Sequence, residues 1–346
     1  MEAAPSAEWG RRMDKRRPAE RALATVVLGC MLISLCLGLC SCERTPSDKI
    51  KIVCTVFPQY DWLRNIIGES ERIELSLIVK NGADIHSYQP TAADIMQIAE
   101  CDMIVYVGGE VDTWVNDALE MADNEQTLKL SMSECEGVMM REISSASENH
   151  EHEGHEHEGH EHGATDEHLW LSLKNAMAIC RALCDALCGL DPDDEQSYIQ
   201  NTEKYIENLS ALDQKYSQTV ESVGENDRFV LFCDRFPFVY LLDDYGVEYI
   251  AAFEGCSADA NADFGTVVRL IEEYDAHSLK CVIVCEDSDG RLAQTVVASS
   301  QAAEGEILVM NSLQAVSQKQ IDGGESYIGL MEENLEVLRA AFGAKN

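Results

Sequence analysis

The chain has 346 residues, and its 62 acidic side chains outnumber the 26 basic ones to give a formal net charge of −36. So negative a chain repels the phosphates of nucleic acids, which excludes a nucleic-acid partner, and it attracts cations. The length is that of a globular protein with two lobes.

The N-terminus has the features of an export signal. The only long apolar run, residues 22–41, follows a segment with six basic side chains and ends in small residues. This order is typical of a signal peptide, although the run is also long enough for an uncleaved membrane anchor. Its end, LCSC, resembles the bacterial lipobox, in which Cys42 is the lipidated residue. We predict a signal peptide over 1–41, a tether over 42–50 and a lipid anchor on the outer face of the cytoplasmic membrane.

Beyond the tether, short apolar runs alternate with amphipathic stretches of helical period. The runs predict buried strands at 51–56, 73–79, 101–107, 228–233, 247–252, 280–285 and 306–310. The intervening stretches predict helices at 62–68, 92–99, 113–122, 173–187, 192–223, 267–275, 291–299 and 327–342. Asp61 is expected to cap the first of these helices. The alternation of strands and helices indicates parallel sheets flanked by helices, and therefore an α/β fold.

The helix predicted at 192–223 is the longest of the set. Its apolar side chains recur at helical period, and Pro192 with the acidic residues after it favours a start there. A helix of about thirty residues is about 45 Å long, longer than one small lobe. We therefore predict a linker helix over 191–224 that joins an N-terminal α/β lobe at 51–190 to a C-terminal α/β lobe at 228–346.

A histidine-rich loop is predicted at residues 149–163 of the N-terminal lobe. It repeats the pentapeptide HEHEG and has no large apolar side chain, so it cannot form part of a core. Neutral imidazole binds zinc and related metals, and the glutamates between the histidines add carboxylate oxygens. We predict an auxiliary metal-binding loop whose ligands are His150, His152, His155, His157, His160 and His162. A solvated linker without a ligand is the alternative.

The chain lacks the familiar motifs of enzymes. GxxxxGK[ST], GxGxxG after a strand, GxSxG and HExxH do not occur in it. We therefore predict no catalytic residue and no enzymatic activity. A zinc hydrolase is the alternative on chemical grounds, because a zinc ion with an open position activates water.

Three motifs taken together resemble those of a known family. They are GADIHSYQP at 82–90, VYVGGE at 105–110, and EHLWLS at 167–172, shortly after the histidine-rich loop. With them the chain, from about Lys51 to its end, resembles the zinc and manganese substrate-binding lipoproteins of ABC transporters, the metal-binding cluster A-I family. The histidine-rich loop resembles that of the zinc-type members. The resemblance implies two lobes of parallel β-sheet flanked by helices and joined by one long rigid helix.

The resemblance also implies a metal site. The family takes one histidine from each of two motifs, and these are His86 and His168 in this chain. The third ligand of the family, usually histidine or glutamate, follows the first strand of the C-terminal lobe, where this chain has Cys233 and Asp234. Both can bind zinc, but neighbours on a strand point to opposite faces, and we favour Asp234 at the strand end. Manganese-type members have an aspartate before the last helix, where Glu325 stands; a carboxylate stabilised by the positive end of that helix is an equal alternative.

The function implied by the resemblance is that of the extracytoplasmic zinc-binding component of an ABC-type uptake transporter. Zn²⁺ is then the transported ligand, and a membrane permease with its ATPase is the partner. Imidazole-rich ligation favours zinc over manganese, with a manganese-specific member as the alternative. A metal-buffering or adhesion lipoprotein without a transporter is a further alternative, because no motif marks a docking surface for a permease. We expect the protein to be a monomer.

Overall fold

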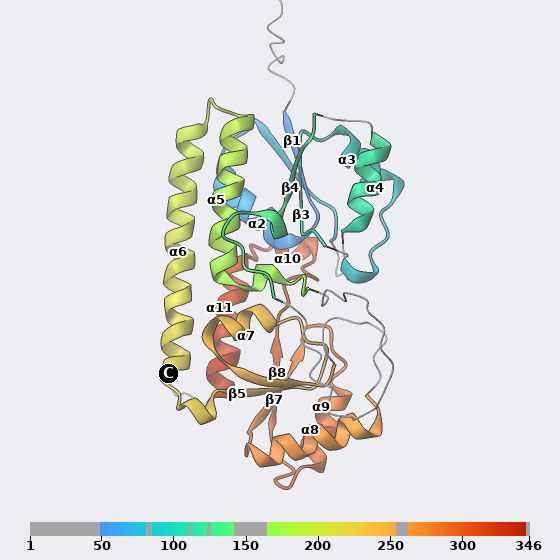
Figure 1. Ribbon diagram of the computed structural model, residues 1–346, viewed down its shortest axis with the longest axis vertical. Helices are drawn as coiled ribbons and strands as arrows, with labels where there is room; N and C mark the ends of the chain where they lie inside the picture. Colours follow the sequence, from blue (N-terminus) through green and yellow to red (C-terminus); the bar gives the residue numbers. More distant parts are fainter. Residues whose placement is uncertain are drawn as a thin grey trace, which may run out of the picture. The chain divides into compact units, whose positions relative to one another are not determined.

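The computed structural model describes most of the chain after the predicted tether (Figure 1). The described residues are 49–80, 83, 85–109, 112–122, 126–141, 165–253 and 262–343. They belong to one compact unit, Lys49–Asn346. None of the helices described in these ranges is long and apolar enough to cross a membrane. The predicted signal peptide, Cys42 and the histidine-rich loop lie outside the described residues.

The N-terminal lobe is built on a four-stranded parallel sheet with the strand order β2-β1-β3-β4. Its strands are β1 (Ile50–Cys54), β2 (Ile73–Leu77), β3 (Met103–Tyr106) and β4 (Leu128–Ser131). Its helices are α2 (Phe57–Ile67), α3 (Ala92–Glu100), α4 (Thr113–Ala122) and α5 (Leu173–Leu190). Short 3-10 turns are η1 (Ile85–Ser87), η2 (Met132–Glu134) and η3 (Leu169–Leu171).

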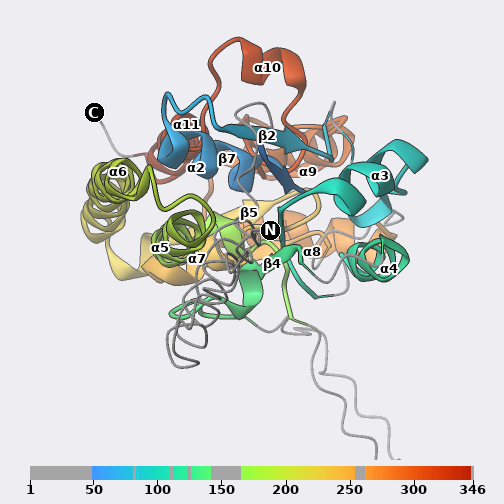
Figure 2. The same ribbon diagram turned by 90° about the horizontal axis from the view of Figure 1, so that it is seen from above.

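Helices cover both faces of this sheet, as a parallel sheet requires. On β1, Ile52 and Cys54 face the core that α2 and α5 close, whereas Val53 faces a second core closed by α3 and α4. In the view from above, α5 and α6 lie on one side of the strands and α3 and α4 on the other (Figure 2). The alternation of the β1 side chains between two cores therefore explains why four of its five residues are apolar, the exception being the exposed Lys51.

The C-terminal lobe repeats this plan with the strand order β6-β5-β7-β8, again all parallel. The strands are β5 (Phe229–Phe232), β6 (Glu248–Ala251), β7 (Cys281–Cys285) and β8 (Glu306–Met310). The helices are α7 (Val239–Tyr245), α8 (Phe264–Ala276), α9 (Arg291–Ser299), α10 (Gln318–Asp322) and α11 (Tyr327–Ala341), and a 3-10 turn, η4 (Glu225–Asp227), precedes β5. Side chains of α7 and α11 share the core of the N-terminal lobe, and those of α8 and α9 close a separate one.

The helix α6 (Glu195–Glu221) contacts elements of both lobes. It packs on α2 and α5 of the N-terminal lobe and on α7 and α11 of the C-terminal lobe. Its 27 residues make it about 40 Å long at 1.5 Å per residue. Near its C-terminal end, the Tyr216 hydroxyl donates a hydrogen bond of 2.6 Å to the carbonyl of Met331 in α11. The predicted fold of two α/β lobes joined by one long helix is therefore confirmed.

The start of α2 corrects one sequence-based prediction. Asp61 does not cap this helix, which begins four residues earlier, at Phe57. Instead, the Gln59 side chain accepts the N–H of Val56 at 3.2 Å and closes the first turn, where Pro58 needs no hydrogen bond of its own. Asp61 lies fully buried within α2 and accepts the N–H of Tyr327 at 3.0 Å, at the first residue of α11. Its carboxylate therefore links the two lobes.

Candidate metal centre

His168 is a buried residue of the EHLWLS motif, directly before three residues that pack in the protein core. The next three residues form η3, all of them buried, and Ser172 then accepts the N–H of Asn175 at 3.0 Å to cap α5. Asp166 accepts the backbone N–H of His168 at 2.8 Å through Oδ1, and the same oxygen lies 3.0 Å from the ring Nδ1. Both side chains are almost completely buried. A carboxylate at Nδ1 holds the proton on that nitrogen and leaves the lone pair of His168 on Nε2.

His86 comes from η1, in the loop that follows β2. Its Nδ1 lies 3.6 Å from Glu167 Oε2, so the residue next to His168 faces the ring of the other histidine. The neighbouring glycine pair of the VYVGGE motif makes room for this carboxylate. Gly109 has a φ of +81°, and a Cβ placed on it would lie 3.2 Å from Glu167 Oε1. A side chain at this position would therefore be strained and would crowd the Glu167 carboxylate.

The two imidazoles meet through their Nε2 atoms, which are 3.2 Å apart. Their ring centroids are 5.1 Å apart and the rings are inclined by 46°. Two interactions are compatible with this geometry. One imidazole can donate a hydrogen bond to the other, or both nitrogens can bind one metal ion. Zinc binds imidazole nitrogen at about 2.0–2.1 Å, and two ligands of a tetrahedral ion are then about 3.3 Å apart. The observed separation therefore matches two adjacent ligand positions of a tetrahedral zinc site.

The pair lies beside the contact between the lobes. The Trp170 ring centroid is 5.2 Å from that of His168, and its indole Nε1 donates a hydrogen bond of 2.9 Å to the carbonyl of Ser312, after β8. The Tyr327 hydroxyl of α11 donates one of 2.6 Å to the Trp170 carbonyl. Residues of the C-terminal lobe thus hold the turn that carries His168.

A buried carboxyl group, that of Asp112, lies close enough to Glu167 for their charges to interact. Asp112 is 1% exposed and accepts the N–H groups of Val107 and Gly108 at the end of β3. Burial raises the pKa of Asp112 to about 7, and the negative charge of Glu167 adds to the rise, against the lowering effect of the two backbone donors.

The two candidates for the third ligand differ in their surroundings. Cys233 is 3% exposed and packs into the core beneath α8 and α9, and burial followed by the charge of Asp234 raises the pKa of its thiol to about 12. Asp234 is half-buried, and its carboxylate accepts the N–H of Arg235 at 2.8 Å and that of Cys285 at 3.4 Å. Asp234 thus also stabilises the ends of β5 and β7.

Glu325 directly precedes the N-cap residue of α11. Its carboxylate lies 3.4 Å from the backbone N of Ser326, while its carbonyl accepts a hydrogen bond from Arg64 Nη2 at 3.1 Å. This arrangement matches the alternative of a carboxylate held by the positive end of the helix.

The structure brings together His86 and His168 but not the whole predicted set. Among the residues that it describes, no group of three or more histidine, cysteine, aspartate or glutamate side chains is arranged to hold a metal ion. The roles of Cys233, Asp234 and Glu325 as ligands remain predictions. So do those of the histidine-rich loop and of Cys42, which fall outside the described residues.

Asp166 and Glu167 are functional candidates that the sequence analysis missed. Each carboxylate lies near the Nδ1 atom of one histidine of the pair, a common arrangement around metal-bound imidazole. The sequence Asp-Glu-His could have indicated Asp166, because a carboxylate two residues before a histidine can fold back to its Nδ1. Which histidine Glu167 would face depends on the fold and could not be read from spacing.

Two parallel four-stranded sheets of the same strand order, with a long helix packed on both lobes, define a two-lobed solute-binding fold. The chain belongs to the family described as zinc-uptake complex component A, periplasmic, whose sequence profile matches residues 52–341.

Relatives in sequence agree with this assignment, and a solved structure shows the same fold. The zinc-binding lipoprotein AdcA of Streptococcus pneumoniae serotype 4 is 30% identical over 312 residues, which cover 89% of this chain and 60% of AdcA. The chain thus spans about 60% of the length of that relative. The high-affinity zinc uptake system protein ZnuA of Bacillus subtilis is 29% identical over 318 residues, which cover 91% of this chain and 95% of ZnuA. The structure of the metal-dependent lipoprotein YcdH of Bacillus subtilis has the same fold, with a TM-score of 0.68 at 24% identity over 85% of this chain and 99% of YcdH.

Proposed function

We propose that this protein captures Zn²⁺ outside the cytoplasm and delivers it to the permease of an ABC-type uptake system. The observation that carries the proposal is the pair of Nε2 atoms 3.2 Å apart, with a carboxylate near the Nδ1 atom of each ring. Such carboxylates orient imidazole ligands and make them more basic. The names of the relatives AdcA and ZnuA, which refer to zinc binding and zinc uptake, support the same ligand.

Zinc fits the pair better than manganese does. Imidazole nitrogen suits zinc, whereas manganese favours carboxylate and water oxygens. Both histidines offer nitrogen, and the carboxylates of Asp166 and Glu167 face their Nδ1 atoms. A manganese-specific protein would instead need oxygen ligands on the Nε2 side. Competitive binding of Zn²⁺ and Mn²⁺ to the protein therefore distinguishes a zinc-specific from a manganese-specific site.

We infer that Asp234 completes the site in preference to Cys233. The thiol is buried among apolar side chains on the face of the sheet covered by α8 and α9, and its raised pKa keeps it protonated at neutral pH. The Asp234 carboxylate is half-exposed at the end of β5, where parallel strands place their ligand sites. Asp234→Ala is expected to weaken zinc binding at least tenfold, about 1.4 kcal/mol, and Cys233→Ser much less. The reverse order would assign the ligand to Cys233.

The proposal also covers the lipid anchor, the histidine-rich loop and the transport partner. We propose that the protein is anchored through a lipid on Cys42 and that the histidine-rich loop gathers zinc weakly before the tight site takes it. Apart from the coordination of the ion, no bond is made or broken in this function, so the protein needs no catalytic residue. Binding stabilises the liganded form by mass action, and the partner is a membrane permease with its ATPase.

Zinc titration of two histidine variants tests the proposal. The background is the protein without residues 150–163, which isolates the tight site from the loop. His86→Ala and His168→Ala are each expected to lower the affinity for Zn²⁺ by at least a hundredfold in competition with a chromophoric chelator. His277→Ala is the matched control, because His277 stacks on Phe229 in the C-terminal lobe. Equal zinc affinity in the background protein and both site variants would refute the proposal, as would tighter binding of Mn²⁺ than of Zn²⁺.

A further inference from the structure

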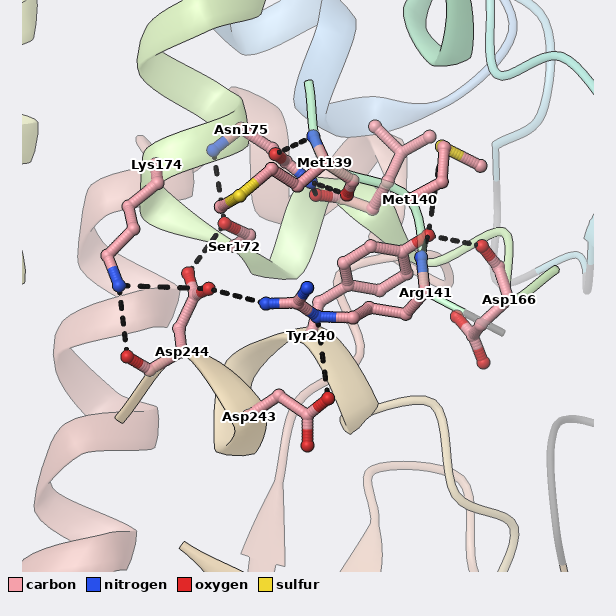
Figure 3. Close-up of polar contacts among 11 residues, drawn as sticks. Met139, Met140, Arg141, Asp166, Ser172, Lys174, Asn175, Tyr240, Asp243 and Asp244 are labelled. Atoms are coloured by element: carbon pink, nitrogen blue, oxygen red, sulfur yellow. Dashed lines mark hydrogen bonds and ion pairs between the residues drawn. The ribbon is translucent and has the colours of Figure 1, made fainter. Parts of the chain in front are cut away.

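One hydroxyl group of the C-terminal lobe joins two segments of the N-terminal lobe. Tyr240, on α7, is 1% exposed, and its hydroxyl accepts the backbone N–H of Arg141 at 3.0 Å and donates to the backbone carbonyl of Asp166 at 2.6 Å (Figure 3). Arg141 and Asp166 also bond to each other, because the N–H of Asp166 donates to the Arg141 carbonyl at 2.8 Å. The three residues therefore form a closed set of hydrogen bonds, with the phenol as the only member from the C-terminal lobe.

A second contact from α7 lies on the other side of His168. The Asp244 carboxylate accepts the hydroxyl of Ser172 at 2.6 Å, and Ser172 is the N-cap of α5. The side chain of Asp244 is 2% exposed, and the cations Lys174 and Arg141 lie 3.8 Å and 3.6 Å from its Oδ1 (Figure 3). Because Asp244 is buried, this network of partners is needed to offset the loss of its hydration.

The two contacts enclose the segment from Asp166 to Ser172. Tyr240 holds its first residue and Asp244 its last, and His168 lies between them. The Asp166 carboxylate in turn lies 3.0 Å from Nδ1 of His168, and the Nε2 atom of that ring faces His86. A continuous path of contacts thus runs from α7 to the atom that would bind the metal.

We propose that Tyr240 is a positioning residue for the metal site: by holding the backbone of Asp166, it fixes the carboxylate that orients His168. This inference rests on the proposed function, since it concerns the same site. Contact of α7 with the segment 166–172 then keeps His168 in the geometry that binds zinc. Loss of that contact frees Asp166 to turn, and the imidazole loses the partner that sets its orientation and its tautomer. Zinc retention therefore depends on a contact between the lobes that touches no metal ligand directly.

The substitution Tyr240→Phe tests this inference, because it removes one oxygen atom and keeps the ring in the core. Tyr245→Phe is the matched control: Tyr245 ends the same helix, and its hydroxyl donates to Asp213 Oδ1 at 2.9 Å instead. Tyr240→Phe loses the bonds to Arg141 and Asp166 and Tyr245→Phe loses the bond to Asp213, so both variants are expected to unfold at a lower temperature. Only Tyr240→Phe is expected to weaken zinc binding at the tight site, by about tenfold, with a correspondingly faster dissociation of Zn²⁺ into excess chelator.

A second measurement separates positioning from a general loss of stability. In the zinc-free protein, nitrogen-15 NMR of the imidazoles reports whether His168 carries its proton on Nδ1. We expect the Nδ1–H form in the wild type and in Tyr245→Phe, and a mixture of tautomers in Tyr240→Phe. A Tyr240→Phe protein with wild-type zinc affinity, dissociation rate and His168 spectrum would overturn the inference. Failure of the wild type to bind zinc would refute the proposed function instead, while the NMR comparison would still decide whether Tyr240 positions His168.

Discussion

Removal of the two carboxylates beside the histidine pair should weaken zinc binding to different extents. Asp166 Oδ1 is within hydrogen-bond distance of Nδ1 of His168, also accepts that residue's backbone N–H, and is almost completely buried. Glu167 Oε2 is 3.6 Å from Nδ1 of His86, and its side chain is 15% exposed. Loss of such outer partners costs about 10- to 100-fold in metal affinity, or about 1.4 to 2.7 kcal/mol. We expect Asp166→Ala at the upper end of this range and Glu167→Ala at or below the lower end.

The assay is competition for Zn²⁺ against a chromophoric chelator at neutral pH, in the protein without residues 150–163. Asp166→Asn is the control for structure, because the amide oxygen can still accept both N–H groups of His168 while the charge is lost. It should therefore bind zinc more tightly than Asp166→Ala does. An effect of Glu167→Ala equal to or larger than that of Asp166→Ala would refute the assignment of Asp166 as the main orienting group.

Further expected outcomes concern stability, pH, the loop and the anchor. Asp61→Ala leaves the buried N–H of Tyr327 without its acceptor, so the free energy of unfolding in urea should fall by about 3 kcal/mol; a change below about 1 kcal/mol would contradict the role of this link between lobes. Burial raises the pKa of Asp112 to about 7 from an ordinary value of 3.8, so the folded protein binds the extra proton and stability should fall as pH rises between these values. Asp112→Asn should flatten that slope in melts across the pH range, and parallel curves would contradict it. Deletion of residues 150–163 should remove the weak class of zinc sites in calorimetry and spare the tight one. Loss of the tight site on deletion would contradict this division between the loop and the tight site. Cys42→Ala should leave the membrane fraction or accumulate as precursor; continued processing and palmitate labelling would exclude Cys42 as the lipidation site.

Most of the α/β framework follows from local sequence patterns. Each of the seven strands predicted from the sequence coincides with a strand of the structure. The central strands β3, β5 and β7 are buried almost throughout and appear in the sequence as continuous apolar runs. The strand β4 was not predicted, because only two of its four residues, Leu128 and Leu130, are apolar and they form no continuous run. The helix α7 was missed as well, since its seven residues are too few to establish a helical period.

The candidate site could be predicted only where a sequence motif marked its residues. The two motifs identified His86 and His168, and the fold brings their Nε2 atoms together. The contribution of Tyr240 could not be foreseen, because it depends on a helix without a sequence signal and on a contact with the backbone of Asp166. Backbone carbonyls accept hydrogen bonds whatever their side chain is, so no residue pattern marks such a partner.

The central claim is that His86 and His168 together bind zinc through Nε2. A crystal structure of the zinc-loaded protein, with anomalous differences measured on both sides of the zinc absorption edge, tests it most directly. We predict one strong peak about 2.0–2.1 Å from both Nε2 atoms, with an oxygen of Asp234 as a further ligand. A zinc peak bound elsewhere, with the two rings still in direct contact at 3.2 Å, would contradict the claim.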